Sequence, residues 1–145
     1  MTLYLDTSSL VKLFIDEPGS DLVGRMVGAA TVVVTSTVAY PESRAAFARL
    51  RRENALSPRA FAAVKSAFER QWPAFLSLEA TEELCRSAGA LAESYSLRGF
   101  DSVHLASYAD VVKRSPAGAV DFSSFDERLN EAARKLNRKL KRRRP

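Results

Sequence analysis

Four acidic residues stand where an apolar stretch of the sequence gives way to a helical one. They are Asp6, Glu42, Asp101 and Asp126. In an open parallel sheet the carboxyl ends of the strands meet at one edge, so acids in such positions gather there although the chain separates them. Carboxylates that share an edge repel one another unless a cation lies between them, and hard oxygen ligands suit Mg²⁺ or Mn²⁺. The pattern therefore predicts a metal-dependent phosphodiesterase.

Each of these acids also has a structural explanation when it is considered alone. Aspartate is a preferred N-cap, because its carboxylate accepts hydrogen bonds from the free N–H groups of the first helical turn. Asp101 and Asp126 both precede helical patterns, and Glu42 fits an exposed helix position. The group is harder to explain in this way, because Asp6 and Asp126 each follow an expected strand, where an unpaired buried charge costs several kcal/mol. A shared cation would offset the repulsion and lower the pKa of an attacking water.

Strands and helices are expected to alternate along the chain. Apolar and β-branched runs indicate strands at residues 2–5, 31–35, 75–78 and 119–124. Capping residues, prolines and helical periodicity indicate helices near residues 8–15, 21–29, 37–53, 58–72, 81–97, 101–112 and 125–136. This alternation predicts an α/β fold: a three-layer sandwich in which a mostly parallel sheet of four or five strands is flanked by helices.

Length and composition are those of an ordinary globular domain. The chain has 145 residues, of which 46% are hydrophobic and 27% charged, enough to bury one core without disulfide bonds. Cys85 is the only cysteine, which excludes a disulfide framework and a cysteine zinc site. No apolar run approaches the roughly 20 residues of a membrane span, and the first residues lack the features of a signal peptide. We expect a cytoplasmic protein that does not enter a membrane.

The net charge of +5 is concentrated at the C-terminus. Residues 134–145 hold eight of the 22 basic side chains and no acid, so residues 1–133 carry 14 bases against all 17 acids. Such a basic end suits contact with the phosphates of a nucleic acid. It equally suits a solvated terminus whose cations favour the negative end of the last helix. Both interpretations stay open.

Several stretches of the sequence resemble a known family when they are taken together. YLDTSSLVKLF with the following PGS, AYPESRAAFARL, LRGFDSVHLAS and SSFDERLNEAA are similar to a PIN domain, most closely to a VapC-type toxin ribonuclease of a type II toxin–antitoxin system. They run from Leu3 to Leu136 in the order and spacing of the family.

The resemblance implies both an activity and the residues that carry it. It implies endonucleolytic hydrolysis of RNA phosphodiester bonds with Mg²⁺ or Mn²⁺, a cognate antitoxin protein that restrains the toxin, and a homodimer. The implied catalytic metal ligands are Asp6, Glu42, Asp101 and Asp126. Ser8 and Ser124 are the implied supporting residues; each lies two positions from an acid and could hydrogen-bond carboxylates or metal-bound waters.

The sequence departs from the family near its C-terminus. Asp121 lies five residues before Asp126 and could compete for the fourth acidic position, but SFDERL matches the family better, and strand alternation points the two side chains to opposite faces. Family members often end with a glycine and a short last strand, where this chain has Asn137 and a basic run. We therefore expect a single PIN-like domain at residues 1–136 and a basic tail at residues 137–145.

Other functions fit the sequence less well. His104 is the only histidine, and its apolar helical surroundings favour packing or a local hydrogen bond over general base catalysis, which a metal-bound hydroxide does not require. An aspartyl phosphatase would need a second aspartate where Ser8 stands. The main alternative is a catalytically silent PIN-like module whose acids are helix caps and whose basic tail holds RNA. It predicts RNA binding that is indifferent to divalent metal.

Overall fold

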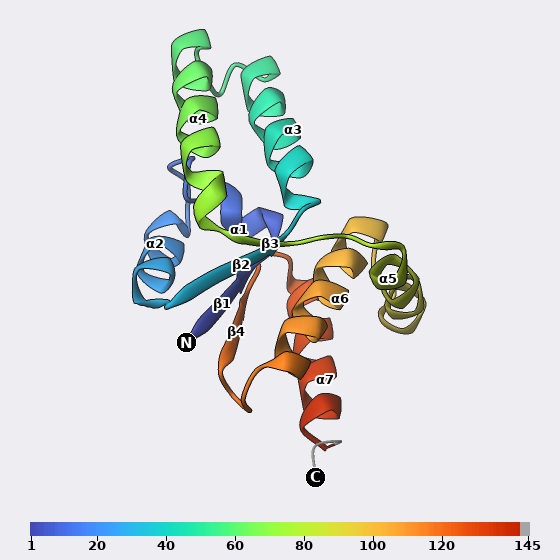
Figure 1. Ribbon diagram of the computed structural model, residues 1–145. Helices are drawn as coiled ribbons and strands as arrows, with labels where there is room; N and C mark the ends of the chain where they lie inside the picture. Colours follow the sequence, from blue (N-terminus) through green and yellow to red (C-terminus); the bar gives the residue numbers. More distant parts are fainter. Residues whose placement is uncertain (143–145) are drawn as a thin grey trace.

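A four-stranded parallel sheet lies at the centre of the computed structural model, which describes residues 1–142 (Figure 1). Its order is β3-β2-β1-β4, and the strands are β1 (Thr2–Leu5), β2 (Val32–Ser36), β3 (Leu76–Leu78) and β4 (Val120–Ser123). Every pairing is parallel, so all four carboxyl ends point to the same edge. The predicted α/β sandwich is confirmed, with four strands, each within one residue of its expected bounds.

Residues 1–142 form seven α-helices and one short 3-10 helix, of which all but α7 lie between strands. They are α1 (Thr7–Val11), α2 (Ser20–Ala29), α3 (Ala39–Arg52), α4 (Pro58–Gln71), η1 (Trp72–Ala74), α5 (Glu82–Tyr95), α6 (Gly99–Arg114) and α7 (Glu127–Arg142). Ser57 and Thr81 cap α4 and α5, as their positions predict. Within residues 1–142, no helix is long and apolar enough to cross a membrane.

Helices cover both faces of the sheet because the side chains of β1 alternate. Tyr4 points into a core formed mainly with α6 and α7, whereas Leu3 and Leu5 point into a second core with α1 to α4. Figure 1 shows this division, with α5, α6 and α7 on one side of the sheet and α1 to α4 on the other. The three layers therefore follow from β1, because its successive residues point alternately into the two cores on either side of the sheet.

Two helices end at positions that differ from those expected. The first helix stops at Val11, and residues 12–14 continue it only through tighter hydrogen bonds to the carbonyl three residues earlier. The last helix does not stop at Leu136 but continues to Arg142, because Leu136 and Leu140 both pack on the core beside α6. Residues 137–142 of the expected basic tail are therefore helical, and residues 143–145 lie outside the described part of the chain.

Candidate active site

Asp6 follows β1 directly and is the N-cap of α1, where its Oδ1 accepts a 3.0 Å hydrogen bond from the backbone N–H of Ser9. Ser8 donates to Oδ1 at 2.7 Å, and Ser124 donates to Oδ2 at 2.6 Å. Only 4% of Asp6 is exposed. Burial raises the pKa of Asp6 above its ordinary value, although the three hydrogen bonds act in the opposite direction. Asp6 is thus a carboxyl group held in place by three hydrogen bonds, and in the absence of a cation its burial favours the neutral form over the ionised one.

Glu42 lies in the first turn of α3 and is held from two other elements. Its Oε1 accepts hydrogen bonds from Thr7 at 2.7 Å and from Nε2 of His104 at 2.9 Å. Burial alone would raise the pKa of Glu42, but the hydrogen bonds from His104 and Thr7, with nearby positive charge, outweigh it and lower the pKa. Both hydrogen bonds fall on Oε1, so Oε2 accepts none from residues 1–142 and is available to another ligand.

His104 links Glu42 to the centre of the sheet. The ring is 2% exposed, and its Nδ1 lies 3.0 Å from the hydroxyl of Tyr4 on β1. Burial raises the pKa of Tyr4, so its hydroxyl keeps its proton and donates to Nδ1. Nε2 then carries the ring proton and donates to Glu42, because a carboxylate can only accept. The expectation of a packed histidine is confirmed, but its hydrogen bonds are not local: they join His104 to Glu42 and to Tyr4, 62 and 100 positions away in the sequence.

Asp101 and Asp126 share a single cation. Asp101 lies in the first turn of α6, and Asp126 precedes α7, where its Oδ1 accepts the backbone N–H of Leu129 at 2.9 Å. Arg98 reaches both carboxylates, at 3.1 Å for Asp101 and 3.6 Å for Asp126. The Arg98 side chain is 80% exposed, so these are surface ion pairs that contribute little to stability.

The four acids lie at the carboxyl edge of the sheet, where Arg98 and Ser124 connect them. Arg98 also attracts Glu42, and Ser124 joins Asp6 to the backbone N–H of Asp126. Within residues 1–142, no three Asp, Glu, His or Cys side chains lie close enough to hold one ion between them as they stand. The donor chemistry still fits a hard divalent cation, because the donors are carboxylate and hydroxyl oxygens and a guanidinium already lies among them. The rival acid Asp121 is inside β4 and exposed, away from this edge.

Three residues that shape the site were not predicted from the sequence: Tyr4, Thr7 and Arg98. Thr7 and Arg98 lie beside the quoted acids Asp6 and Asp101 in the sequence, but nothing in their type marked them. The link to His104 had one signal, because residues three apart on a helix share a face and His104 is three positions after Asp101.

Removing the Tyr4 hydroxyl is expected to weaken both the fold and the site. Tyr4→Phe leaves Nδ1 of His104 without a donor in a buried position, which should lower the free energy of unfolding by about 1–2 kcal/mol. It also frees the ring that orients Glu42, so activity and Mn²⁺ affinity should fall about tenfold, as for other residues that orient a ligand. Urea unfolding and Mn²⁺ titration of the purified variant measure the two effects.

Tyr108 offers a matched control for this substitution. It is 2% exposed and packs against Tyr4 in the same aromatic group, but its hydroxyl makes no hydrogen bond within residues 1–142. Tyr108→Phe should therefore leave Mn²⁺ affinity unchanged. Equal losses of Mn²⁺ affinity in both variants would mean that aromatic packing, and not the bond to His104, holds Glu42.

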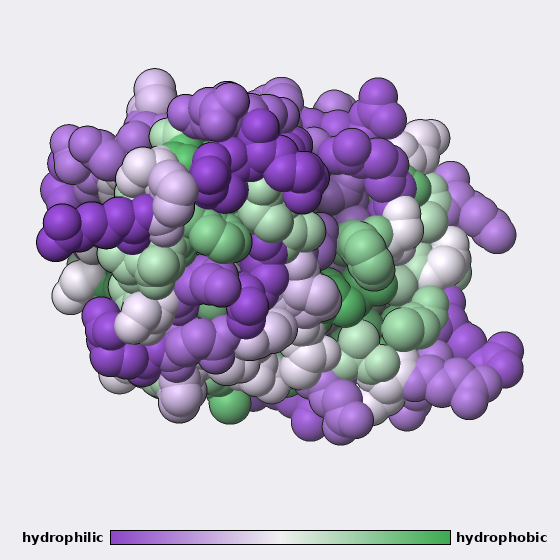
Figure 2. Space-filling view, turned by 90° about the horizontal axis from the view of Figure 1, so that it is seen from above, coloured by the Kyte–Doolittle hydropathy of each residue, from purple (hydrophilic) through white to green (hydrophobic). Residues whose placement is uncertain are grey.

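The edge that carries the acids has a mixed surface. Figure 2 views the molecule from the side to which the carboxyl ends of the strands point, and it shows mostly hydrophilic residues with hydrophobic patches between them. Phe100 and Phe125 are 58% and 43% exposed, and each immediately precedes one of the site acids, Asp101 and Asp126. Apolar rings thus lie at the border of the acidic site.

Known proteins resemble this chain along most of its length. Residues 3–135 match the PIN domain family. Ribonuclease VapC45 and Ribonuclease VapC49, from two strains of Mycobacterium tuberculosis, are each 38% identical over 131 residues, which cover 90% of this chain and 88% of the relative. Ribonuclease VapC35 of the same species is 31% identical over 135 residues. The crystal structure of M. tuberculosis VapC20, a Sarcin-Ricin loop cleaving toxin, shares the fold at a TM-score of 0.63 and 19% identity, covering 90% of this chain and 94% of that one.

Proposed function

Because the chain belongs to the PIN domain family and is 38% identical to VapC ribonucleases, we propose that it is a divalent-metal-dependent endoribonuclease whose acidic edge is the catalytic centre. The ribonuclease relatives support hydrolysis of RNA phosphodiester bonds as the reaction. Two parts of the proposal rest on the geometry of the site. One is the use of Mg²⁺ or Mn²⁺, and the other is the assignment of the ligands as Asp6, Glu42, Asp101 and Asp126.

The single observation that carries the metal assignment is the position of Arg98. Its guanidinium lies between Asp101 and Asp126 and attracts Glu42, so this edge already requires a positive charge. A divalent ion would compete with the guanidinium for the same carboxylates. When bound, the metal supplies a contact for a phosphate oxygen and a lowered pKa for its water.

The protein's own contribution is to hold the carboxylates in place. Ser8 and Ser124 fix both oxygens of Asp6, and Thr7 and His104 fix Oε1 of Glu42. Oxygens that are held before the substrate arrives need no reorganisation during the reaction, which is a main source of catalytic power at charged sites.

The exposed rings beside the acids favour a single-stranded RNA segment as the substrate. Phe100 and Phe125 present apolar surface on which unpaired bases can stack, and sequence-specific RNA enzymes commonly act on loops whose bases are unstacked. The Nζ of Lys12 lies 4.4 Å from the centre of the Phe125 ring and pairs with Glu17 at 2.8 Å, so Glu17 already balances its charge beside this ring. If one base stacked on Phe100 and the next on Phe125, the phosphate between the two bases would lie over the acids.

The family also suggests partners. We propose a cognate antitoxin protein that inserts a basic side chain among the carboxylates, because the site already accepts Arg98 there and arginine pairs strongly with carboxylates. A homodimer and action on RNA in the cytoplasm complete the proposal.

Metal removal tests the function directly. We expect purified protein to cleave a mixed pool of structured RNAs with Mg²⁺ or Mn²⁺, and the cleavage to stop in EDTA and to return when metal is restored. Cleavage that continues in EDTA would contradict the metal assignment. RNA binding without cleavage, unchanged by metal, would favour the silent binding module.

A further inference from the structure

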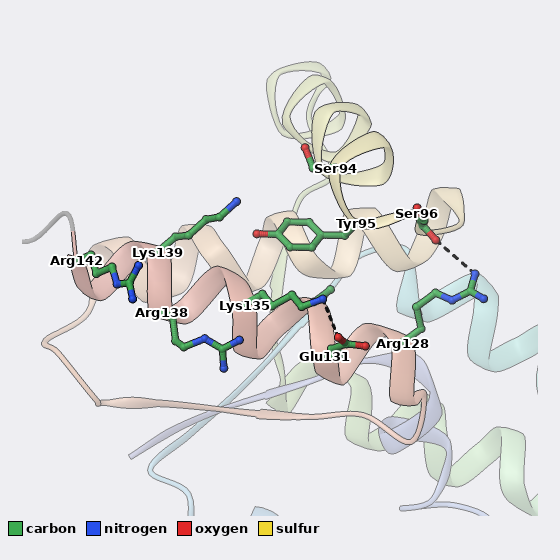
Figure 3. Close-up of a pocket in the computed structure, with 10 residues that line it drawn as sticks. Ser94, Tyr95, Ser96, Arg128, Glu131, Lys135, Arg138, Lys139 and Arg142 are labelled. Carbon is green, nitrogen blue, oxygen red and sulfur yellow. Dashed lines mark hydrogen bonds and ion pairs between the residues drawn. The ribbon is translucent and has the colours of Figure 1, made fainter.

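A basic groove runs along α7 and is separate from the acidic site. It has a volume of about 520 Å³ and lies between the end of α5 and one face of α7 (Figure 3). Its lining comprises residues 94–96 and the α7 side chains Arg128, Glu131, Lys135, Arg138, Lys139 and Arg142. We call it the α5–α7 groove.

The cations of the groove form a stripe along one face of α7, which Glu131 interrupts between Arg128 and Lys135. Arg128, Lys135, Arg138 and Arg142 follow one another at intervals of seven, three and four residues, which places them on one face of a helix. The distance from the first to the last is about 21 Å at 1.5 Å per residue. The stripe is therefore long enough to contact several consecutive phosphates of one strand.

One end of the stripe lies at the border of the acidic site. Arg128 is two residues after Asp126, and its guanidinium donates a 3.4 Å hydrogen bond to the carbonyl oxygen of Ser96. Ser96 is in turn two residues before Arg98, which contacts Asp101 and Asp126. A strand whose phosphate lies over the acids could thus continue directly into the groove.

Little of the positive charge is neutralised inside the groove. Glu131 is the only acid in the lining, and it pairs with Lys135 at 2.7 Å. The hydrogen bond and charge of Lys135, with the charges of Arg134 and Arg138, lower the pKa of Glu131. Arg138 and Arg142 form no ion pair with any residue of 1–142.

We infer that the α5–α7 groove binds the sugar–phosphate backbone of the RNA beyond the cleaved bond. The inference rests on the proposed ribonuclease function and adds to it the path of the substrate. Arginine and lysine bind phosphates without reading the sequence, and the hydroxyls of Ser94 and Ser96 can add hydrogen bonds to phosphate or sugar oxygens. The groove therefore supplies affinity, while the edge of the sheet supplies the chemistry.

The test measures RNA binding in an inactive protein, so that the RNA stays intact. In the Asp101→Asn background and in EDTA, the charge reversals Arg138→Glu and Arg142→Glu together should raise the Kd for a single-stranded RNA at least about tenfold. They should also make the dependence of log K on log salt less steep by about 1.4, the value expected for two lost phosphate contacts on a single strand. Fluorescence anisotropy of a labelled RNA at several salt concentrations measures both quantities.

Arg52→Glu combined with Arg59→Glu is the matched control. Both arginines are exposed, lie around the connection between α3 and α4, and form no ion pair within residues 1–142. The control pair changes the net charge by the same amount and should alter the Kd less than about twofold. Equal weakening by both pairs, or no weakening by the groove pair, would overturn the inference.

Cleavage by the active protein separates this inference from the proposed function. If the protein cleaves RNA, the groove pair should raise KM about tenfold; an unchanged KM would reject the groove and leave the ribonuclease standing. If the protein does not cleave RNA but the groove pair still weakens binding, the groove stands as a binding surface and the proposed activity fails.

Discussion

Replacing Asp101 with asparagine should lower RNA cleavage by about a hundred- to a thousandfold and leave the protein folded. The first part follows because asparagine removes a negative charge from a site proposed to hold a divalent cation, and losing one such electrostatic contact typically costs a hundred- to a thousandfold in rate. The second part follows because, within residues 1–142, the Asp101 carboxylate forms its hydrogen bond and ion pair with Arg98 alone, and the Arg98 side chain is 80% exposed. Cleavage rate, circular dichroism and urea unfolding of the variant measure the two effects.

Asp110 provides the control on the same helix. It is also an aspartate of α6 that pairs with an exposed arginine, Arg114, at 3.1 Å, but it lies more than two turns away from the acidic edge. Asp110→Asn should therefore retain full activity. If Asp101→Asn cleaves RNA as fast as wild type, the acidic edge is not the catalytic centre.

The positions of the four strands and their parallel pairing could be predicted because each strand carries its own signal. Residues 31–35 are nearly all β-branched and residues 2–5 are short and apolar, and the helical stretches between strands require parallel pairing. The hydrogen bond from Ser8 to Asp6 was also expected, because the two residues are two positions apart at the start of a helix. Contacts that are local in sequence depend only on local geometry.

Contacts between distant residues could not be predicted in the same way. The bond between His104 and Glu42 spans 62 positions, and that between His104 and Tyr4 spans 100. Both hydrogen bonds depend on how α6 packs across β1. The side-chain volumes in the core determine that packing, and the periodicity of the sequence does not reveal it. The full length of α7 was hidden for another reason: its basic composition resembles a solvated tail, and only the contacts of Leu136 and Leu140 with the core show that it is a packed helix.

Asp6→Asn should make the metal-free protein more stable while it abolishes cleavage. The pKa of Asp6 is raised by burial, so the folded state resists ionisation of this group. The stability associated with the neutral carboxyl is fully present below the unfolded pKa, near 3.8, and is lost as the pH rises through the folded pKa. Asparagine stays neutral at every pH and caps a helix as well as aspartate does. At pH 7 in EDTA, the free energy of unfolding should rise by about 1–2 kcal/mol, as when a strained functional residue is replaced.

Divalent metal should make the wild-type protein more stable than Asp6→Asn, the reverse of the order expected in EDTA. Wild type gains stability with Mn²⁺ in proportion to the logarithm of the metal concentration, because the ion binds the folded state, whereas Asp6→Asn should gain much less. Asp121→Asn is the control, since Asp121 is an exposed acid on β4, and it should change neither the stability in EDTA nor the response to Mn²⁺. Urea unfolding at pH 7 and near pH 4, with EDTA or Mn²⁺, measures these differences. If Asp6→Asn is instead less stable than wild type in EDTA at pH 7, the hydrogen bonds from Ser8, Ser9 and Ser124 outweigh the cost of burial. Asp6 would then be a structural cap, and the binding module would become the better account of the acidic edge.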